Sequence, residues 1–245
     1  MPIQIIPVKI QKDIIPNDNL VDLVLESTEI RDDDILVFSQ KIVSKNEGRI
    51  ISLASVNPSL LANGISSSYD KDPKLIELIL SESKRIVRME NGIIIVETNH
   101  GFVCANSGID SSNVKGEDIV ALLPDDSDAS ARKILDKLKS MSGCRNLGVI
   151  VTDTFGRAWR EGHVNFSIGN AGFDPFIDYK DTVDAVGKTL KVTTIAVADE
   201  LAAASELVTG KALNIPAVLI RGAAVNFSEE LTHSLIRPIE NDMFR

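Results

Sequence analysis

The stretch over residues 147–172, LGVIVTDTFGRAWREGHVNFSIGNAG, limits the possible fold more than any other part of this 245-residue chain. It opens with a short apolar run over residues 147–151 that is rich in β-branched side chains and predicts a buried strand. We expect this strand to end at Thr152, where Asp153 and Thr154 follow. A carboxylate between two hydroxyl groups offers the hard oxygen ligands that Mg²⁺ and Mn²⁺ prefer.

Charged side chains crowd the next segment, in which Arg157, Arg160, Glu161 and His163 fall within seven residues and are interleaved with glycine. This density is more typical of a loop that faces a charged ligand than of a surface helix. The alternative is that the preceding Asp-Thr pair caps a turn or helix, which is worth about 1 kcal/mol, while the arginines form a solvated surface. The residues alone leave both interpretations open.

The composition, with 44% hydrophobic and 25% charged residues, is that of a globular protein large enough for one domain or two lobes. No apolar run approaches the ~20 residues that a membrane span requires. The first residues, MPIQIIPVKI, are too short and too interrupted by proline for a secretory signal, so we expect a cytoplasmic protein. We find no clear linker and no internal repeat.

Charge and cysteine content exclude several kinds of site. The net charge of −9 argues against a nucleic-acid partner, whose phosphates would require a basic surface. An acidic protein can still bind small phosphates if metals and a local basic cluster reverse the field. Cys104 and Cys144 lie far apart without C-x-x-C spacing, so they indicate buried free thiols rather than a disulfide framework or a zinc site.

Hydrophobic periodicity and turn signals predict mixed α and β structure. Strands are expected at residues 3–10, 35–38, 93–96, 102–105, 147–151, 192–197 and 215–220. Helices are expected at 19–28, 72–88, 182–190 and 199–208, and from Ser127 or Asp128 as N-cap to Gly143. Asn91-Gly92 predicts a hairpin turn, and the Asn-, Ser- and Gly-rich segment 57–71 is predicted to be a loop.

A second strand end carries another carboxylate, Asp110, within the polar segment NSGIDSSNV. If the fold brings Asp110 and Asp153 together, their charges repel, and a divalent cation removes the conflict. Lys41 and Lys45, which follow the strand at 35–38, are candidates for anion binding. Carboxylates that hold metals, with lysines or arginines that neutralise the remaining charge, are the usual arrangement for phosphoryl chemistry.

Several common motifs are absent from the sequence. It contains no G-x-x-x-x-G-K-[ST] loop and no G-x-G-x-x-G loop after a strand, so a nucleotide is not bound by the common loops. It contains no G-x-S-x-G elbow, and its three histidines give a serine or cysteine triad little support.

Five segments, in order along the chain, resemble the coenzyme F420-0:L-glutamate ligase family. They are VFSQKIVSKNEGRI, HGFVCANSGIDSSNV, LLPDDSDASAR, VIVTDTFGRAWREGHVNFSIGNAG and VADELAAASELVTGKALNIPAVLIRG. The resemblance spans nearly the whole chain. It implies an enzyme that uses GTP to add γ-linked glutamates to a deazaflavin coenzyme, with an acyl phosphate formed at the terminal carboxylate of the precursor F420-0.

The resemblance also implies the fold and the assembly. The family has an α+β fold with mixed and antiparallel sheets and packed helices, and it forms intertwined homodimers with sites near the subunit boundary. We therefore expect residues 1–245 to form a single catalytic unit, with two lobes as the alternative, within a homodimer. The expected partners are the small molecules GTP, L-glutamate and F420-0, with no nucleic acid and no membrane.

The resemblance assigns roles residue by residue. Asp110 and Asp153 resemble ligands of one divalent cation and Thr154 a ligand of a second, so two Mg²⁺ or Mn²⁺ ions per site are expected, with K⁺ as a further candidate. The expected catalytic residues are Arg157, Arg160 and His163. The expected nucleotide contacts are Gln11, Lys12, Asp13, Ile14, Gln40, Lys41, Lys45, Asn113, Leu207, Val208, Thr209, Gly210, Lys211, Ala212, Leu213 and Asn214.

The chain departs from the family pattern at Thr209-Gly210-Lys211, where many archaeal members carry Met-Gly-Gln. A lysine ammonium cannot replace an amide oxygen as a metal ligand. Either the second cation has another ligand, or Lys211 contacts a phosphate directly. Two alternative functions follow: a metal-dependent ligase that glutamylates another acceptor, such as a folate-like molecule, and a non-catalytic GTP-binding regulatory module.

Overall fold

A five-stranded sheet forms the centre of the main body of this computed structural model, which describes residues 2–111, 118–210, 213–229 and 234–243. Its strands lie in the order β1 (Gln4–Val8), β12 (Ala217–Arg221), β2 (Asp34–Ser39), β8 (Leu147–Arg157) and β9 (Arg160–Ala171). Neighbouring strands are antiparallel except β2 and β8, which are parallel. The expected α+β class with mixed and antiparallel sheets is therefore confirmed.

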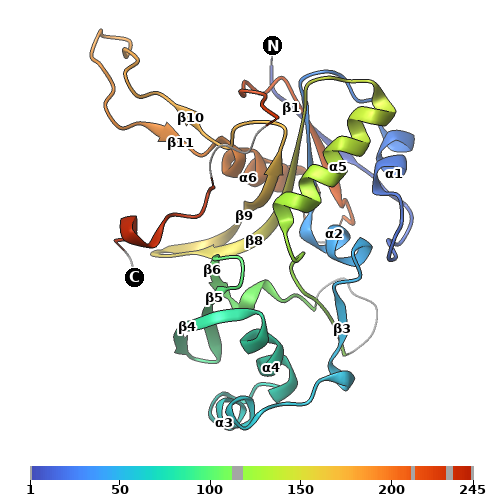
Figure 1. The fold of residues 1–245 in the computed structure, drawn as a ribbon, viewed down its shortest axis with the longest axis vertical. Helices are drawn as coiled ribbons and strands as arrows, with labels where there is room; N and C mark the ends of the chain where they lie inside the picture. Colours follow the sequence, from blue (N-terminus) through green and yellow to red (C-terminus); the bar gives the residue numbers. More distant parts are fainter. Residues whose placement is uncertain (1, 112–117, 211–212, 230–233, 244–245) are drawn as a thin grey trace.

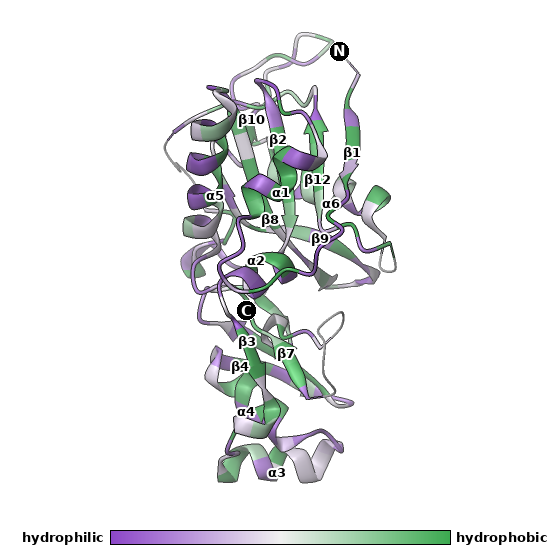
Figure 2. Ribbon diagram, turned by 90° about the vertical axis from the view of Figure 1, so that its right-hand side faces the viewer, coloured by the Kyte–Doolittle hydropathy of each residue, from purple (hydrophilic) through white to green (hydrophobic). Residues whose placement is uncertain are grey.

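Both faces of this sheet are buried, which explains why its inner strands are almost continuously apolar. Leu36 and Phe38 point to one face and Ile35 and Val37 to the other. The helices that cover the faces are α1 (Leu20–Ser27), α5 (Ser127–Ser142) and α6 (Val197–Thr209). Figure 2 shows largely hydrophobic strands beside α5, along which many residues are hydrophilic.

A smaller part of the chain lies below the main body in Figure 1 and has cores of its own. Its elements are β3 (Ile50–Ser52), η1 (Leu53–Ser55), α3 (Leu60–Tyr69), α4 (Pro73–Ser81), β4 (Ser83–Glu90), β5 (Ile93–Thr98), β6 (Val103–Ala105), η2 (Asn106–Gly108) and β7 (Ile119–Ala121). Strands β4, β5 and β6 form an antiparallel sheet, and β3 pairs with β7. Ile76, Ile79 and Ile94 are buried between α4 and the three-stranded sheet.

Two helix ends follow the capping chemistry expected from the sequence: Asp72 caps α4, and Gly143 ends α5 in the left-handed conformation. Asn19, expected as the first residue of a helix, is the N-cap of α1. The start of α5 differs from the prediction, because Asp126 is the N-cap and accepts the N–H of Ala129 at 2.9 Å. The predicted hairpin at Asn91-Gly92 joins β4 to β5.

The segment 57–71, predicted to be a loop, contains the helix α3 instead. Ser59 caps this helix by accepting the N–H of Ala62, and Ala62 and Ile65 are buried in the core shared with α4. Tertiary burial of this apolar stripe outweighs the weak helix propensity of the many Ser, Asn and Gly residues.

Helix α4 ends at Ser81, although the sequence predicted a helix as far as Arg88. The following residues form β4, because they pair with β5 across the hairpin turn. A single apolar residue among charged ones, such as Ile86, fits one side of a helix as well as one side of a strand. Local periodicity does not show whether a strand is available to pair with this segment, and that pairing decides between helix and strand.

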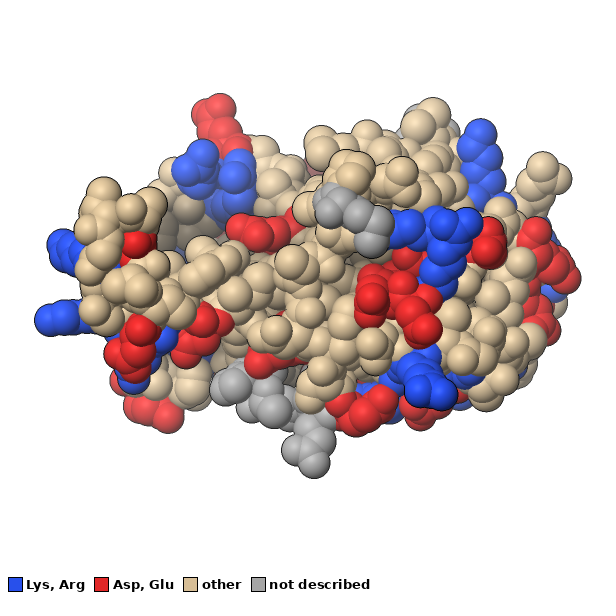
Figure 3. All heavy atoms as spheres, turned by 90° about the horizontal axis from the view of Figure 1, so that it is seen from above, with Lys and Arg blue, Asp and Glu red and all other residues tan. Residues whose placement is uncertain are grey.

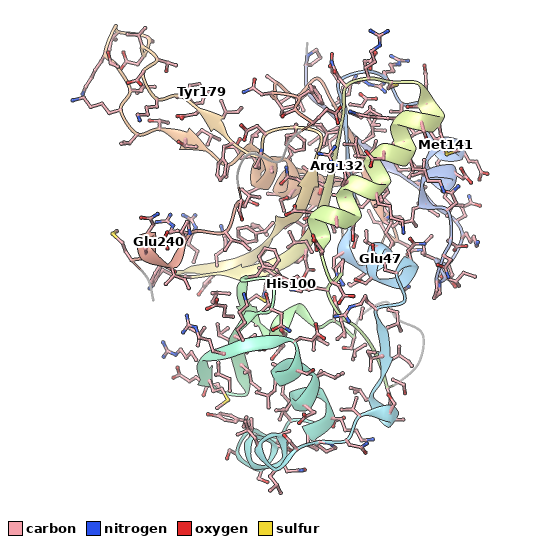
Figure 4. All side chains as sticks on the ribbon, in the orientation of Figure 1. Glu47, His100, Arg132, Met141, Tyr179 and Glu240 are labelled. Atoms are coloured by element: carbon pink, nitrogen blue, oxygen red, sulfur yellow. The ribbon has the colours of Figure 1, made fainter. Side chains whose placement is uncertain are left out.

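Strand β8 does not end at Thr152 as predicted but continues to Arg157 and pairs with β9 along its length. The charged segment is therefore the tip of a two-stranded ribbon, which extends to the left above the smaller part in Figure 1. Aromatic rings join the ribbon to that part, with centroid distances of 5.9, 6.1 and 5.9 Å along the series His100, Phe102, Phe155 and Phe166. In Figure 4, His100 lies at this junction.

Residues 182–190, predicted to be a short helix, belong instead to an arm that extends from the main body in Figure 1. The Asp184 side chain accepts the N–H of Val186 at 3.0 Å, and this local turn competes with a helix. The strand predicted at 192–197 is correspondingly short. The base of the arm pairs β10 (Ile177–Asp178) with β11 (Thr194–Ile195).

The surface and the C-terminal segment add little to the site. On the face shown in Figure 3, acidic and basic side chains are interspersed. Near the C-terminus, η3 (Ile239–Asn241) is a single 3₁₀ turn. Within the described ranges, none of the helices combines the length and the apolar character that a membrane crossing requires.

Candidate functional site

A cavity of about 1000 Å³ opens where the parallel strands β2 and β8 last pair with each other. There β2 ends and the chain turns into α2 (Gln40–Asn46), while β8 continues into the ribbon. The walls come from distant parts of the sequence: loop 13–16, α2, residues 108–110, the ribbon, the end of α6 and residues 214–216. This volume suits a ligand of cofactor size.

The cavity brings together many of the residues that the sequence and the family resemblance single out. They come from all three predicted sets, the metal, nucleotide and catalytic residues. Those that line it are Asp13, Ile14, Lys41, Lys45, Asp110, Asp153, Thr154, His163, Thr209, Gly210 and Asn214.

Other predicted residues lie outside this lining. Arg157 donates a hydrogen bond to the Glu161 carbonyl at 2.6 Å, and Arg160 is exposed near the ribbon tip. Lys12 forms an ion pair of 2.6 Å with Asp18. The remaining residues outside the lining are Gln11, Gln40, Leu207, Val208 and Leu213. The predicted residues Asn113, Lys211 and Ala212 lie outside the described residues.

Gln40 is fully buried at the start of α2 and fastens this helix to the chain after β7. Its Nε2 group donates to Ser44 Oγ and to the Leu122 carbonyl, both at 2.7 Å. Among the described residues, its Oε1 atom has no hydrogen-bond partner. Gln40 therefore positions the helix that carries the two lysines of the cavity.

A strained turn presents Asp110 to the cavity. Non-glycine residues rarely adopt positive φ, yet Asn106 and Ser107 have φ values of 52° and 58°, and Gly108 follows at 68°. Ser107 is buried and its hydroxyl donates to the Glu82 carbonyl at 2.9 Å. Asp110 and Ala121 then exchange two backbone hydrogen bonds of 3.0 and 2.8 Å. These contacts fix the position from which the Asp110 carboxylate reaches the cavity.

Lys41 and Lys45 reach the cavity from the same side of α2, because residues four apart lie one above the other on a helix. The Lys41 ammonium lies 2.8 Å from Asp110 Oδ2. This ion pair joins a residue expected to hold a cation to one expected to contact a nucleotide.

The lining of the cavity is predominantly acidic. Among the described residues it carries two ammonium groups, of Lys41 and Lys45, against four carboxylates, of Asp13, Asp110, Asp153 and Glu206. An anionic ligand would meet repulsion here unless cations accompanied it.

Asp153 and Thr154 point to opposite faces of the ribbon, because successive side chains alternate along a strand. Cross-strand pairing places Asp153 opposite Phe166 and Thr154 opposite Asn165. On the Asp153 face, burial first and the negative charge of Asp153 second raise the pKa of the Cys104 thiol to about 12. The alternation suits the expected assignment of Asp153 and Thr154 to different cations.

A chain of hydrogen bonds lies on the Thr154 face. Thr154 Oγ1 donates to Asn165 Oδ1 at 2.7 Å, and Asn165 Nδ2 donates to Glu206 Oε2 at 3.2 Å. Thr209 Oγ1 donates to the same Glu206 oxygen at 3.0 Å. The chain links the ribbon to the last turn of α6.

Sequence reasoning missed several polar residues of the lining. The alternation of His163, Asn165 and Ser167 with apolar residues is a strand pattern that could have identified Asn165. For Glu206 the signal is weaker: it is a carboxylate in the last turn of a helix, where the helix dipole disfavours negative charge. The missed residues are Ser39, Asn165, Ser205 and Glu206.

The donors at the cavity fit a hard divalent cation. In the part of the chain that the structure describes, no group of three or more His, Cys, Asp or Glu side chains is arranged to hold a metal ion. The oxygen donors of Asp110, Asp153 and Thr154 nevertheless face the cavity. Mg²⁺ commonly combines one or two carboxylates with water and substrate phosphates, so this donor set suits a cation that arrives with a nucleotide.

The chain is similar to known proteins over most of its length. A family model for F420-0:Gamma-glutamyl ligase matches residues 9–222. The chain is 48% identical to the Coenzyme F420:L-glutamate ligase of Methanothermobacter thermautotrophicus over 220 residues, 89% of this chain and 86% of that protein. It is 36% identical to the protein of the same name from Archaeoglobus fulgidus over 246 residues, 100% of this chain and 97% of that protein. The chain belongs to the F420-0:gamma-glutamyl ligase family.

Proposed function

We propose that this chain joins L-glutamate to the deazaflavin precursor F420-0 by an amide bond and uses GTP to activate the acceptor carboxylate. The main support is the cavity of about 1000 Å³ in which Asp110, Asp153, Lys41 and Lys45 converge from distant segments. The relatives at 48% and 36% identity are named Coenzyme F420:L-glutamate ligases, which supports the acceptor and the amino acid.

The charge of the cavity supports a cation-dependent reaction of anions. GTP, glutamate and F420-0 are all anionic, whereas the described lining has more carboxylates than ammonium groups. Divalent cations held by Asp110, Asp153 and Thr154 would neutralise the charge of the substrates and of the carboxylates in the lining. They would also polarise the phosphoryl group that is transferred. Lys41 now pairs with Asp110 at 2.8 Å, and a cation held by Asp110 would leave this ammonium for a phosphate oxygen.

The proposed reaction has two steps. A carboxylate oxygen of F420-0 attacks the γ-phosphorus of GTP, and the bond from this phosphorus to the β-phosphate oxygen breaks. GDP departs as the leaving group, and F420-0 now carries an acyl phosphate. The amino nitrogen of glutamate then attacks the acyl carbon, loses a proton and expels inorganic phosphate. Catalysis comes chiefly from positioning and charge neutralisation, for which Lys41 and Lys45 are available.

We assign the ribbon residues to the second step. His163 lines the cavity opposite Gly156, and we give it the role of accepting the proton of the incoming amine. Arg157 and Arg160 lie nearer the ribbon tip, outside the lining, and we assign them to the anionic groups of the acceptor.

We also propose that the chain acts as a homodimer, and the arm supports this assembly. Tyr179, Val183, Val186 and Val192 on the arm are exposed. In Figure 4, Tyr179 lies on the arm, away from the main body. Apolar side chains on a projecting arm are typical of a surface that a second subunit covers.

Phosphate release from GTP tests the proposed function. The purified protein is supplied with Mn²⁺ or Mg²⁺ and L-glutamate, with and without F420-0, and the product mass is measured. We expect release that requires both substrates, with a mass gain of one glutamate residue.

Two other outcomes would point elsewhere. Release and glutamylation with a folate-like acceptor, but not with F420-0, would establish a ligase of different specificity. GTP binding without release under any of these conditions would favour a regulatory module.

A further inference from the structure

Arg49 joins the two parts of the molecule at the place where the chain passes between them. As Figure 1 shows, the chain leaves the main body after α2 and enters β3 of the smaller part, and it returns after β7 on the way to α5. Arg49 lies in the first of these two connections, and its carbonyl accepts the N–H of Leu122 in the second at 3.0 Å. The N–H of Arg49 donates to the Ser44 carbonyl at 2.8 Å. The backbone of this residue therefore ties both connections to the helix that carries Lys41 and Lys45.

The side chain of Arg49 contacts three acceptors from different segments. Its Nε donates to the Leu123 carbonyl at 3.0 Å, while Nη2 lies 2.8 Å from Glu82 Oε2 and Nη1 lies 3.2 Å from Asp125 Oδ1. Glu82 belongs to the smaller part, whereas Leu123 and Asp125 lie in the second connection. The Asp125 side chain is 82% exposed, so this pair is weak, but the side chains of Arg49 and Glu82 are only 21% and 20% exposed. The Glu82 contact therefore holds the guanidinium against the smaller part.

Two routes of hydrogen bonds lead from Arg49 to Asp110. On the first, the Glu82 carbonyl accepts the Ser107 hydroxyl at 2.9 Å, and Ser107 belongs to the strained turn that precedes Asp110. On the second, Ala121 exchanges two backbone hydrogen bonds with Asp110, and the residue after Ala121 is the one whose N–H the Arg49 carbonyl accepts. The orientation of Arg49 is therefore passed to Asp110 from both sides.

An arginine suits this junction because its guanidinium group is planar and presents five N–H donors in a fixed geometry. Acceptors from the two connections and from the smaller part must then lie in set directions around one plane. A lysine ammonium keeps the charge but holds acceptors without this fixed plane. Arg49 and Glu82 lie outside the lining of the cavity, so they act on it through the residues that they hold.

We propose that Arg49 is a positioning residue that, through Glu82, sets where the smaller part places the Asp110 carboxylate. This inference rests on the proposed function, because that function gives Asp110 a divalent cation to hold. The groups that share the cavity with this carboxylate, Lys41 and Asp153, belong to the main body. The two parts must therefore be held in one orientation for a cation to be bound between them.

The physical effect is on the fraction of molecules that can bind the cation. Without Arg49 the smaller part would sample several orientations, and Asp110 would be in place in only some of them. The apparent affinity for the cation falls by the fraction of molecules in the competent orientation. An excess of the cation selects that orientation and recovers it.

The test is Arg49→Met, which removes the guanidinium and keeps an apolar side chain. Arg132→Met is the matched control: the Arg132 side chain is similarly buried, at 27% exposed, and contacts the carboxylate and the carbonyl of Glu229, but it joins α5 to the C-terminal segment. Arg49→Lys is the conservative variant, because it keeps a positive charge beside Glu82. Free Mn²⁺ is measured by electron paramagnetic resonance during titration of each protein, and the Mn²⁺ dependence of phosphate release is measured separately.

We expect Arg49→Met to weaken Mn²⁺ binding by about 10-fold, the usual effect of removing a partner that orients a metal ligand. The Mn²⁺ concentration for half-maximal phosphate release should rise by a similar factor, and excess Mn²⁺ should restore most of kcat. Arg49→Lys should lose less affinity than Arg49→Met but should not equal the unchanged protein. Arg132→Met should bind Mn²⁺ as the unchanged protein does.

A combined variant shows whether Arg49 acts through Asp110. Asp110→Asn removes the ligand that Arg49 positions, so Arg49→Met should weaken Mn²⁺ binding much less in that background than in the unchanged protein. A role in general stability would give the same loss in both backgrounds.

An unchanged Mn²⁺ titration in Arg49→Met would overturn the proposal, as would an equal loss in Arg132→Met or an undiminished loss in the Asp110→Asn background. Failure of the unchanged protein to bind Mn²⁺ would also overturn it, because Asp110 would then hold no cation. Circular dichroism checks the fold of each variant, and if Arg49→Met does not fold, Arg49→Lys serves for the same comparisons. If the unchanged protein binds Mn²⁺ but releases no phosphate with both substrates, the proposed function fails, and the Mn²⁺ titration still decides the role of Arg49.

Discussion

Asp153 is the residue whose charge the proposed reaction needs most directly. It faces the cavity from the ribbon, and Asp153→Asn removes the charge while it keeps the volume of the side chain. We expect glutamate-dependent phosphate release to fall on the order of 100-fold or more, because even partners of metal ligands are worth 10–100-fold. Thermal melting and circular dichroism should change little. Full activity in this variant would refute the metal assignment.

Two further carboxylates protect the outer edge of the sheet. Asp128 accepts the N–H of Asn170 at 2.8 Å, and Asp199 accepts the N–H of Ser167 at 2.9 Å. Both donors belong to β9, the last strand of the sheet, whose free edge would otherwise expose them. The two carboxylates, from α5 and α6, therefore provide acceptors for the N–H groups of β9. The same hydrogen bonds hold the two helices on this strand.

The charged form of Asp199 is destabilised by burial in this position. Burial raises the pKa of its carboxyl group above the ordinary value of 3.8, and the hydrogen bond from Ser167 only partly offsets this. Between pH 3.8 and the higher pKa of the folded state, the folded protein holds a proton that the unfolded chain has lost. The contribution of Asp199 to stability is therefore greatest at low pH and falls as the pH rises through this window.

Substitution separates the hydrogen bond of Asp199 from its charge. Asp199→Asn keeps an acceptor for Ser167, so the free energy of unfolding at pH 7 should stay within about 1 kcal/mol of the unchanged protein, or above it. Asp199→Ala leaves the N–H without its acceptor and should cost about 1–3 kcal/mol. Urea unfolding at pH 5 and pH 7 measures both effects. Equal losses in the two variants would show that charge, rather than the hydrogen bond, stabilises this edge.

At the scale of elements, the ribbon and the helix α2 make the cavity. The parallel pairing of β2 with β8 ends at Ser39 and Thr152, and the two chains then diverge, one into α2 and the other into the ribbon. Lys41 and Lys45 come from the first, and Asp153 and Thr154 from the second. The divergence places cationic and anionic side chains on facing walls of one cavity.

The arm is the element on which the proposed dimer depends. Val186 and Val192 are each 88% exposed, so a polar substitution there should not disturb the core of this chain. We expect the double substitution Val186→Asp and Val192→Asp to shift the protein from dimer to monomer in light scattering, because buried charges oppose association. Val87→Asp, on the exposed side of β4, is the control. A dimer that survives the double substitution would exclude the arm as its main contact.

At the scale of the whole molecule, the cavity lies between two parts with separate cores. Asp110 comes from the smaller part, whereas Lys41 and Asp153 come from the main body. The Lys41–Asp110 ion pair and the aromatic series join the two parts in this structure. A ligand that contacts both parts should therefore stabilise them together.

Thermal unfolding tests this linkage. With the Mn²⁺ complex of GTP present as one ligand at 100 times its dissociation constant, binding should add about 2.7 kcal/mol to the free energy of unfolding and raise Tm. Asp110→Asn should reduce this shift, because the smaller part loses its cation ligand. An undiminished shift in Asp110→Asn would show that the ligand is held by the main body alone.

The sequence by itself determined the features that arise from local chemistry. The β-branched runs at 35–38 and 147–151 are buried strands because apolar residues on both sides can only lie between two covered faces. Asp72 caps a helix, and Asn91-Gly92 closes a hairpin, because this side chain and this backbone act within three or four residues. The motifs also predicted the family, which the comparisons confirm.

Only the tertiary structure decided which distant segments meet. Residues 83–90 became a strand because β5 was available to pair with them, and segment 57–71 became a helix because α4 offered a surface to bury its apolar side. In the same way, Glu206 belongs to the site because α6 packs on β9 and brings it to Asn165. The contact between Asn165 and Glu206 joins residues 41 positions apart, far beyond the one helical turn that local signals reach. Residues 83–90 and 57–71 carry patterns that fit more than one structure, and the neighbour that packs on each segment decides between them.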